Sequence, residues 1–308
     1  MLLSMVNVLT PAYGTALNYG SAIRVEAPLF AAIAFTNEYR RQALYHKTAE
    51  FLSMGIDSGK SINGIVTHTM RCSRNFIPKE RVQEFNQTAV DIAKKARDLH
   101  ARKEGILIFG DMSVMGDCYS DTSLADSVDE AAEYHIQQAR VLKNAGVDAL
   151  WAETVGNDLE AKAFAQVAQT LGIPLYISVV LDTKGNVLNH MPIGQFITEV
   201  DMVSCSRPVN YLSNCSWERQ VEAMYHKARD TGVILRLGGF YNNASDVTHG
   251  NKQELTEIKR YDSVADYISW VQTMLKEFSH LQTEKNIWIS GCCGFGADDI
   301  DQLIKSIA

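Results

Sequence analysis

Basic residues are scattered rather than clustered in this 308-residue sequence. The 29 Lys and Arg residues are outnumbered by 36 Asp and Glu residues, which gives a formal net charge of −7. No basic run is longer than a pair such as Arg40-Arg41. A protein that binds nucleic acid normally presents a concentrated positive surface to the phosphates. We therefore expect no nucleic acid partner.

Long apolar segments are also lacking. No stretch reaches the roughly 18 consecutive apolar residues that a membrane-spanning helix needs. The apolar start of the chain, Met1–Leu9, resembles the core of a signal peptide, but the first basic residue is Arg24, so the positive segment that precedes such a core is missing. We expect Val6–Leu9 to form a buried strand, and we expect no membrane partner.

Cysteine is sparse, and most catalytic sequence motifs are absent. The chain has only 6 cysteines, too few for a disulfide scaffold, and Cys292 and Cys293 are adjacent, which suits separate bridges poorly. A reducing, cytoplasmic location is expected. No HExxH, GxxxxGK[ST] or GxSxG motif occurs, and the glycines at 291, 294 and 296 lack the dinucleotide-binding spacing.

Short β-rich apolar runs alternate with longer segments of helical periodicity, which is typical of β/α units around a parallel sheet. Eight runs are predicted to be strands: Val6–Leu9, Gly64–Thr67, Ile106–Gly110, Ala149–Glu153, Leu175–Val180, Val209–Asn214, Ile234–Gly238 and Ile287–Gly291. Eight such units favour an α/β fold, a single (β/α)8 TIM barrel in which residues 1–308 form one domain.

The segments between these runs carry helix signals. Ser127 is a plausible N-cap with Glu130 three residues later, which predicts a capping box. The connections Asp111–Ser127 and Tyr241–Val264 are unusually long, and both follow strands, so we expect them on the face where barrel active sites are built. Four helices are predicted with clear boundaries: Val82–Arg102, Ser127–Asn144, Asp158–Leu171 and Trp217–Thr231.

Three cysteines follow predicted strands. Cys292 and Cys293 follow the last strand among glycines that permit a turn, and Cys215 follows the strand at 209–214. The carboxyl ends of barrel strands meet at one mouth, so all three thiols can face the same point. Three protein ligands with one open position are typical of a catalytic zinc site. Free cysteines also often only fill core space, and spacing does not decide between the two.

Several segments together resemble the homocysteine S-methyltransferase family, which includes betaine- and S-methylmethionine-dependent enzymes. The Tyr13-Gly14-Thr15-Ala16-Leu17 segment is similar to the family's Met-Gly-Thr-Glu-Leu turn, and Ile65–Met70 is similar to its Ile-Thr-Thr-Asn-Thr-Tyr strand. The other matching segments are Gly291-Cys292-Cys293-Gly294, Asn214-Cys215, the stretch from Tyr134 to Glu153-Thr154, and Leu159–Lys162. The resemblance spans nearly the whole chain.

This resemblance implies the same (β/α)8 barrel and a Zn²⁺ cofactor held by Cys215, Cys292 and Cys293. It implies that Glu153 holds the amino group of an amino-acid substrate. No catalytic residue is predicted beyond the zinc site. The other residues predicted to bind substrate lie in the matching motifs: Thr15, Thr67, His68 and Asn214.

The chain departs from the family pattern in the half that binds the amino acid. Thr10-Pro11 stands where the family has Asp-Gly, with an aspartate that helps to bind substrate, and Ala16 stands where it has Glu. His68 and Met70 replace the usual Asn and Tyr. The cysteine motifs that would hold the metal match the family. The resemblance therefore supports thiol chemistry more strongly than it supports homocysteine as the acceptor.

The implied activity is methyl transfer from a sulfonium or quaternary ammonium donor to a thiol. S-methylmethionine, S-adenosylmethionine or betaine would be the donor, and homocysteine, giving methionine, or a related thiol would be the acceptor. Zinc coordination removes the thiol proton, and aromatic side chains attract a cationic donor. Tyr13 and Phe240 are candidates for that cradle, whereas Trp151 lies inside a strand and is expected to pack.

Two other functions stay open. One is a different zinc-assisted reaction such as hydrolysis, for which three electron-donating thiolates are poor ligands because they weaken the acidification of bound water. The other is a non-catalytic or regulatory relative that keeps only the metal site. The expected partners are a small thiol and a methyl donor, and a homo-oligomer is an open possibility.

The remaining cysteines and the acidic residues of the first long connection have ordinary explanations. Cys72, Cys118 and Cys205 lack a glycine-turn context and are predicted to be packing or surface thiols. Three aspartates could suggest a hard divalent cation, but scattered aspartates of this kind are predicted to be solvated or turn-forming: Asp111, Asp117 and Asp121.

Overall fold

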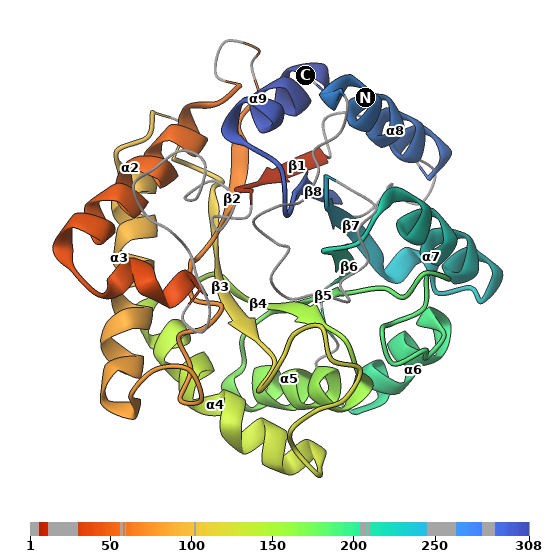
Figure 1. The fold of residues 1–308 in the computed structure, drawn as a ribbon, viewed down its shortest axis with the longest axis horizontal. Coiled ribbons are helices and arrows are strands. Elements are labelled where there is room, and N and C mark those ends of the chain that lie inside the picture. The colour runs from red at the N-terminus through yellow and green to blue at the C-terminus, as the bar shows by residue number, and fades with distance from the viewer. Residues whose placement is uncertain are drawn as a thin grey trace.

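Eight parallel strands form a closed barrel surrounded by helices (Figure 1). The computed structural model describes residues 6–11, 30–55, 58, 60–101, 103–203, 208, 210–244, 263–278 and 287–307. Each strand pairs in parallel with the next along the chain, and the last pairs with the first, where Val6 lies opposite Ile287. The predicted (β/α)8 barrel is confirmed.

The strands lie close to their predicted positions, with two informative differences. The strands are β1 (Val6–Leu9), β2 (Ile62–Val66), β3 (Leu107–Ser113), β4 (Ala149–Val155), β5 (Leu175–Val179), β6 (Asn210–Asn214), β7 (Leu237–Asn242) and β8 (Ile287–Gly291). The prediction ended β3 at Gly110, but the strand continues to Ser113. The prediction placed β7 at Ile234–Gly238, but Ile234–Arg236 forms a 3-10 turn and the strand follows it.

The shift of β7 has a local cause. Gly239 has φ of 140°, and a Cβ there would lie 1.8 Å from the backbone oxygen of Trp288. Glycine within a strand often marks such a close approach of two backbones. The glycine pair at 238 and 239 therefore lies inside β7, where the sequence suggested the end of the strand.

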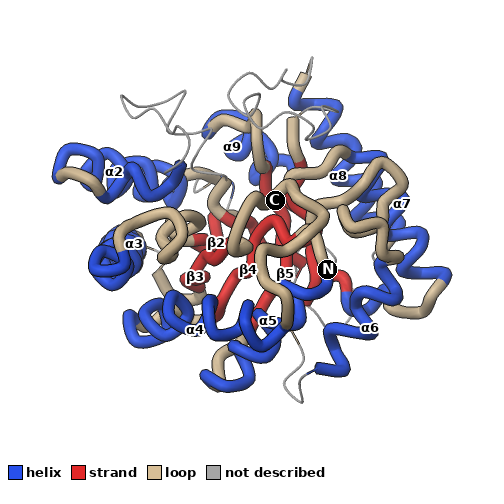
Figure 2. Tube along the Cα trace, turned by 60° about the horizontal axis from the view of Figure 1, so that its bottom comes forward, coloured by secondary structure: helices blue, strands red, loops and turns tan. Residues whose placement is uncertain are grey.

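The helices cover the outside of the barrel (Figures 1 and 2). The α-helices are α2 (Glu38–Ser53), α3 (Val82–Asp98), α4 (Val128–Ala145), α5 (Asp158–Leu171), α6 (Ile193–Val203), α7 (Glu218–Asp230), α8 (Val264–Glu277) and α9 (Ala297–Ser306), and the 3-10 helices are η2 (Phe30–Phe35), η4 (Lys79–Arg81) and η5 (Ile234–Arg236). The predicted end of α3 at Arg102 is wrong. Leu99, which the periodicity places on the buried face, is 71% exposed just beyond the last turn.

The predicted N-cap of α4 is confirmed, but its capping box is not reciprocal. The hydroxyl of Ser127 accepts a hydrogen bond from the Glu130 backbone N–H at 3.2 Å. The Glu130 carboxylate accepts from the Asp126 N–H at 2.9 Å, rather than from Ser127. Glu130 therefore fixes the residue that precedes the cap.

Replacing Ser127 with alanine is expected to destabilise the protein by about 1 kcal/mol, because one N–H of the first turn of α4 loses its acceptor. Urea unfolding measures this change. Ser127→Thr keeps the acceptor and should recover most of the loss. Equal stability of the two variants would show that the cap contributes nothing.

The core has two layers, and the inner one closes the bottom of the barrel. Inside the strands, Phe109 packs edge-on against Trp151 and Trp288, with ring centroids 5.5 and 5.0 Å apart. The expected packing role of Trp151 is confirmed, since its side chain is fully buried. The rest of the inner layer is Leu9, Val66, Ala149 and Leu212. Above this plug, toward the carboxyl ends of the strands, the inward positions of β3 and β4 become acidic, with Asp111 two residues after Phe109 and Glu153 two residues after Trp151.

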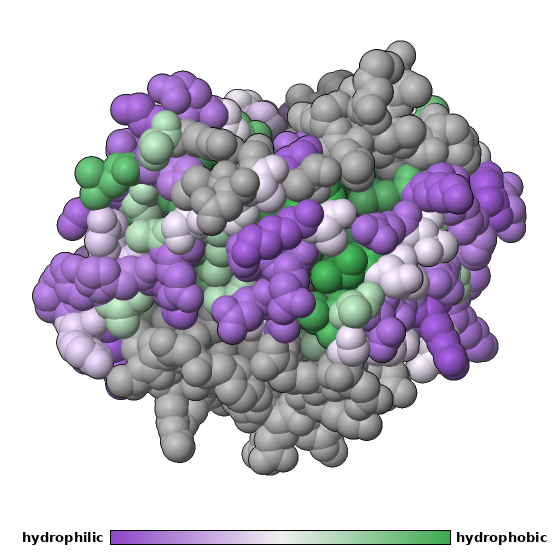
Figure 3. Space-filling model, turned by 90° about the horizontal axis from the view of Figure 1, so that it is seen from above, coloured by the Kyte–Doolittle hydropathy of each residue, from purple (hydrophilic) through white to green (hydrophobic). Residues whose placement is uncertain are grey.

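On the face shown in Figure 3, the described surface is mostly hydrophilic, and hydrophobic residues form small separate groups among hydrophilic ones. None of the helices in the described part of the chain is long and apolar enough to cross a membrane.

Candidate metal centre and substrate site

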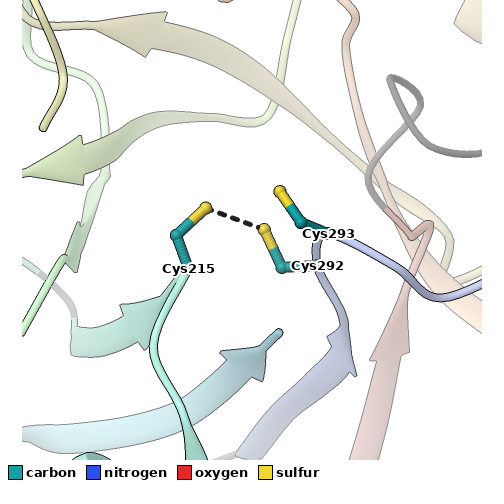
Figure 4. Close-up of side chains that lie close together, drawn as sticks. All are labelled: Cys215, Cys292 and Cys293. Atoms are coloured by element: carbon teal, nitrogen blue, oxygen red, sulfur yellow. Dashed lines mark hydrogen bonds between the residues drawn. The ribbon is translucent and has the colours of Figure 1, made fainter. Parts of the chain in front are cut away.

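The three predicted cysteines converge at the mouth of the barrel (Figure 4). Cys215 directly follows β6, and Cys292 and Cys293 directly follow β8. Their Sγ atoms all lie within 4.8 Å of one another, and those of Cys215 and Cys292 are 3.0 Å apart. Cys215 and Cys292 are buried, and Cys293 is half-buried. The cluster has the size of a site for one ion with Zn–S bonds of about 2.3 Å.

Backbone turns bring these side chains together. Cys215 has φ of 47°, a left-handed conformation that is costly for a residue with a side chain and that often occurs at functional sites. Gly294, with φ of 89°, supplies the corresponding turn after the cysteine pair. The Cys215 N–H donates to the carbonyl of Tyr241, and the Cys292 N–H donates to that of Asn242. Both turns are therefore held against the end of β7.

The surroundings of Cys292 and Cys293 favour their protonated forms. Hydrogen bonds with Cys215 and Cys293, followed by burial, raise the pKa of Cys292 well above its usual value. The hydrogen bond with Cys215 and burial likewise raise the pKa of Cys293. Three soft sulfur donors brought together in this way suit zinc better than calcium or magnesium, which prefer oxygen. The residues present therefore fit the zinc ion that the sequence predicts.

Two tyrosines that the sequence analysis did not identify border the cysteines. The Tyr119 hydroxyl, on the connection after β3, donates to Cys215 Sγ at 3.6 Å. Tyr241 on β7 is buried against Cys215 and Cys292, and its hydroxyl donates to the Thr10 carbonyl at 2.9 Å. Strand alternation at the end of β7 could have identified Tyr241 if the strand had been placed correctly.

Of the two residues predicted to cradle the donor, only Phe240 lies in the described part of the chain. Phe240 faces outward, packing against Tyr225 and Trp270 at centroid distances of 6.3 and 5.0 Å. The prediction for Phe240 is wrong because β7 runs on past Gly238, so that Phe240 points out and Tyr241 points in. Tyr13 lies outside the described residues.

Glu153 and Asn214 lie together in the mouth. Glu153 is buried inside β4, which continues to Val155. Burial raises the pKa of Glu153 to about 8, and the nearby Cys215 contributes in the same direction. Hydrogen bonds with Asp111 and Asn214 act in the opposite direction but are outweighed. Asn214 Nδ2 donates to Thr154 Oγ1 at 2.7 Å and more weakly to Glu153 Oε1 at 3.4 Å. Asn214 thus orients the carboxyl group.

Asp111 is buried, so the expectation of a solvated or turn-forming residue is wrong. It lies inside β3, opposite Trp151 in the strand register. Burial, the charge of Glu153 and a hydrogen bond with that carboxyl raise the pKa of Asp111 well above its usual value. The sequence predicted a loop at Asp111 because β3 continues beyond its apolar run, into the polar layer of the mouth.

The other predicted substrate residues have varied positions. Thr67 is buried, and its hydroxyl accepts from the Asp111 N–H at 2.9 Å, so its observed role is to hold β3. His68 lies beside Phe35 of η2, with ring centroids 6.4 Å apart, and burial lowers its pKa to about 3, so that it is neutral. Thr10, where the family has aspartate, uses its hydroxyl to accept from the Val66 N–H. Thr15 lies outside the described residues.

A buried carboxylate anchors the connection that carries Tyr119. Glu160 on α5 accepts from the Ser123 hydroxyl at 2.7 Å and the Met115 N–H at 3.2 Å. Its other oxygen lies 2.5 Å from His135 Nε2 on α4. Glu160 belongs to the Leu159–Lys162 motif, for which the sequence predicted no role. Here it fastens the residues after β3 to two helices.

Two further cysteines in the described part of the chain lie outside the three-sulfur cluster. Cys72 and Cys118 are buried, which fits the expected packing role. Burial raises the pKa of Cys118 to about 12, and Arg71 Nη2 lies 3.7 Å from its sulfur. Cys205 lies outside the described residues.

Comparisons with known proteins agree with this architecture. The family model for homocysteine S-methyltransferase matches residues 8–307. Homocysteine S-methyltransferase 3 of Zea mays is 25% identical over 238 residues, which cover 70% of this chain and 65% of the maize protein. A selenocysteine methyltransferase of Astragalus bisulcatus is 22% identical over 260 residues, covering 74% of this chain and 72% of that protein. This chain therefore spans about 65% of the length of the maize relative.

A solved structure shows the same fold. The metallated form of the homocysteine methyltransferase MmuM from Escherichia coli superposes with a TM-score of 0.76 and 16% identity. The match covers 99% of this chain and 96% of that one.

Proposed function

Because this chain belongs to the homocysteine S-methyltransferase family, we propose that it is a zinc-dependent thiol methyltransferase. The observation that carries the proposal is the cluster of three cysteine sulfurs at the mouth of the barrel, all within 4.8 Å of one another. Cys215, Cys292 and Cys293 would hold the ion. The acceptor would be homocysteine, giving methionine, or a related thiol, and the donor would be S-methylmethionine, S-adenosylmethionine or betaine.

Cys215, Cys292 and Cys293 would hold the ion as thiolates, and the bound ion would keep an incoming thiol deprotonated and nucleophilic at neutral pH. The surrounding residues position the reactants and exclude water. Glu153 would hold the substrate's amino group, with Asn214 fixing the orientation of the carboxyl. Tyr241 and Tyr119 border the sulfurs and would face the cationic donor.

The transfer itself requires little from the protein beyond alignment. The acceptor sulfur forms a bond to the methyl carbon while the bond from that carbon to the donor's sulfur or nitrogen breaks. The electron pair of the broken bond stays on the donor, which leaves as a neutral thioether or tertiary amine. Holding the two reactants in line inside a dry mouth is the main contribution expected from the buried residues around the cysteines.

The free thiols and the closed barrel also support proposals about the compartment and the domain organisation of the protein. Thiols that must stay free to bind a metal suit a reducing compartment, so we place the protein in the cytoplasm. We also propose that residues 1–308 act as one catalytic domain, because strands from both ends of the chain close the same barrel.

A metal and activity measurement tests this proposal. Protein purified anaerobically in the presence of zinc is expected to hold about one zinc ion per chain and to form methionine from homocysteine with at least one of the three donors. Protein without bound zinc would contradict the metal site. One zinc per chain with no methylation of homocysteine or another small thiol by any donor would instead favour a non-catalytic relative.

A further inference from the structure

The mouth of the barrel contains a second acidic group beside Glu153. Asp111 is only 3% exposed, and its Oδ1 atom has no hydrogen-bond partner among the described residues. Its carboxyl is hydrogen-bonded with that of Glu153. A buried carboxyl oxygen without a partner is costly, so this pair needs an explanation beyond packing.

The strand register places both carboxyls in the barrel interior, above the apolar plug. Asp111 follows the inward-facing Phe109 by two residues, and Glu153 follows the inward-facing Trp151 by two. Alternate residues of a strand share a face, so both carboxyls point inward. Asn214, which directly precedes Cys215, donates from Nδ2 to Glu153 Oε1 at 3.4 Å. The carboxyl pair therefore lies beside the sulfur cluster.

Asp111 is held firmly in this position. Its N–H donates to Thr67 Oγ1 at 2.9 Å, and its carbonyl accepts from Thr69 Oγ1 at 2.6 Å. The two threonine hydroxyls lie 2.8 Å apart and complete the chain of hydrogen bonds. Both the N–H and the carbonyl of Asp111 are therefore held by the segment that follows β2, as expected of a residue that must present its carboxyl group accurately.

Among the described residues, no Lys, Arg or His forms an ion pair with Asp111 or Glu153. Two adjacent buried carboxyls cannot both ionise unless a positive charge joins them. A primary ammonium has three N–H donors and can satisfy both carboxylates at once, whereas the methyl-bearing centre of a sulfonium or quaternary ammonium donor has none.

We propose that Asp111 and Glu153 together bind the ammonium group of the amino-acid substrate, so that Asp111 is a second determinant of specificity for an amino acid over a simple thiol. This inference rests on the proposed function, which places the substrate's sulfur at the cysteines. Asp111, which the sequence predicted to lie in a loop, would then be a residue of β3 that recognises the substrate's ammonium group.

The test compares binding of two thiols that differ only in the amino group. Isothermal titration calorimetry with zinc-loaded protein gives the Kd of L-homocysteine and of 4-sulfanylbutanoate. The intact chain should bind homocysteine at least about 10-fold more tightly, and Asp111→Asn should remove most of that ratio, because a charge-assisted hydrogen bond is lost. The affinity of Asp111→Asn for 4-sulfanylbutanoate should stay within about twofold of that of the intact chain.

Control variants distinguish loss of the Asp111 carboxylate from other causes of weaker binding. Asp121→Asn changes an exposed aspartate on the connection after β3 and should leave both affinities unchanged. Zinc content and thermal unfolding report whether Asp111→Asn is folded, and Asp111→Ser provides a second test of the same position. Loss of both affinities to the same degree in folded protein, or no loss of the ratio in either variant, would overturn the proposal.

The outcomes also separate this inference from the proposed function. Methyl transfer with no amino-group selectivity in binding would overturn the role of Asp111 alone. Amino-group selectivity without methyl transfer would overturn the proposed reaction alone. Failure of the intact chain to bind either thiol would count against both.

Discussion

Cys215→Ser is expected to weaken zinc binding by at least about 100-fold and to reduce methyl transfer to background. The site offers three sulfur ligands within 4.8 Å of one another, so losing one leaves two, too few for a stable catalytic zinc site. Even residues that only support metal ligands contribute about 10- to 100-fold to affinity, and a direct ligand should contribute more. Elemental analysis of zinc per chain after dialysis measures the loss of zinc binding. The rate of methionine formation measures the loss of methyl transfer.

A matched change at another buried thiol controls for general damage. Cys72 is buried but lies outside the three-sulfur cluster, so Cys72→Ser makes the same chemical change without removing a ligand. This variant should keep about one zinc per chain. Full zinc occupancy in folded Cys215→Ser would contradict the three-thiolate site, and equal loss in both variants would point to unfolding.

The cysteine cluster could be predicted because it depends on topology rather than on detailed packing. Once 209–214 and 287–291 are identified as parallel barrel strands, the residues that follow them must meet at one mouth. The prediction did not include the left-handed turn at Cys215. Non-glycine residues seldom adopt that conformation, and no residue type in the sequence signals it.

The polar layer of the mouth was harder to predict. In β3 and β7, inward-facing residues change from apolar to polar as the strand rises above the plug, from Phe109 to Asp111. The usual strand signal is an apolar run, so the prediction ended β3 at Gly110 and placed β7 too early. As a result, Asp111 was interpreted as a loop residue and Tyr241 was overlooked. The residues nearest the chemistry are thus those where hydrophobic patterning is weakest.

Glu160→Gln is expected to destabilise the protein by about 3 kcal/mol at pH 7, because it removes one charge from a buried pair with His135. For a chain of this size the melting temperature should fall by roughly 6 to 10 °C. The exposed Glu133→Gln on α4 carries the same chemical change and should alter stability by less than about 0.5 kcal/mol. Thermal and urea unfolding of both variants measure the difference.

The pH dependence of this difference identifies its origin. Burial disfavours the Glu160 carboxylate, but hydrogen bonds from His135, Ser123 and the Met115 N–H outweigh burial and hold its pKa below the usual 4.5. A depressed pKa in the folded state stabilises the protein above the unfolded value, and this contribution is lost as the pH falls through the folded value. The gap between the intact chain and Glu160→Gln should therefore be full at pH 7 and shrink below about pH 4. If this difference in stability stays constant into the acidic range, the variant disturbs packing rather than charge. If the difference shrinks, the carboxylate itself holds the connection that carries Tyr119 in place beside the cysteines.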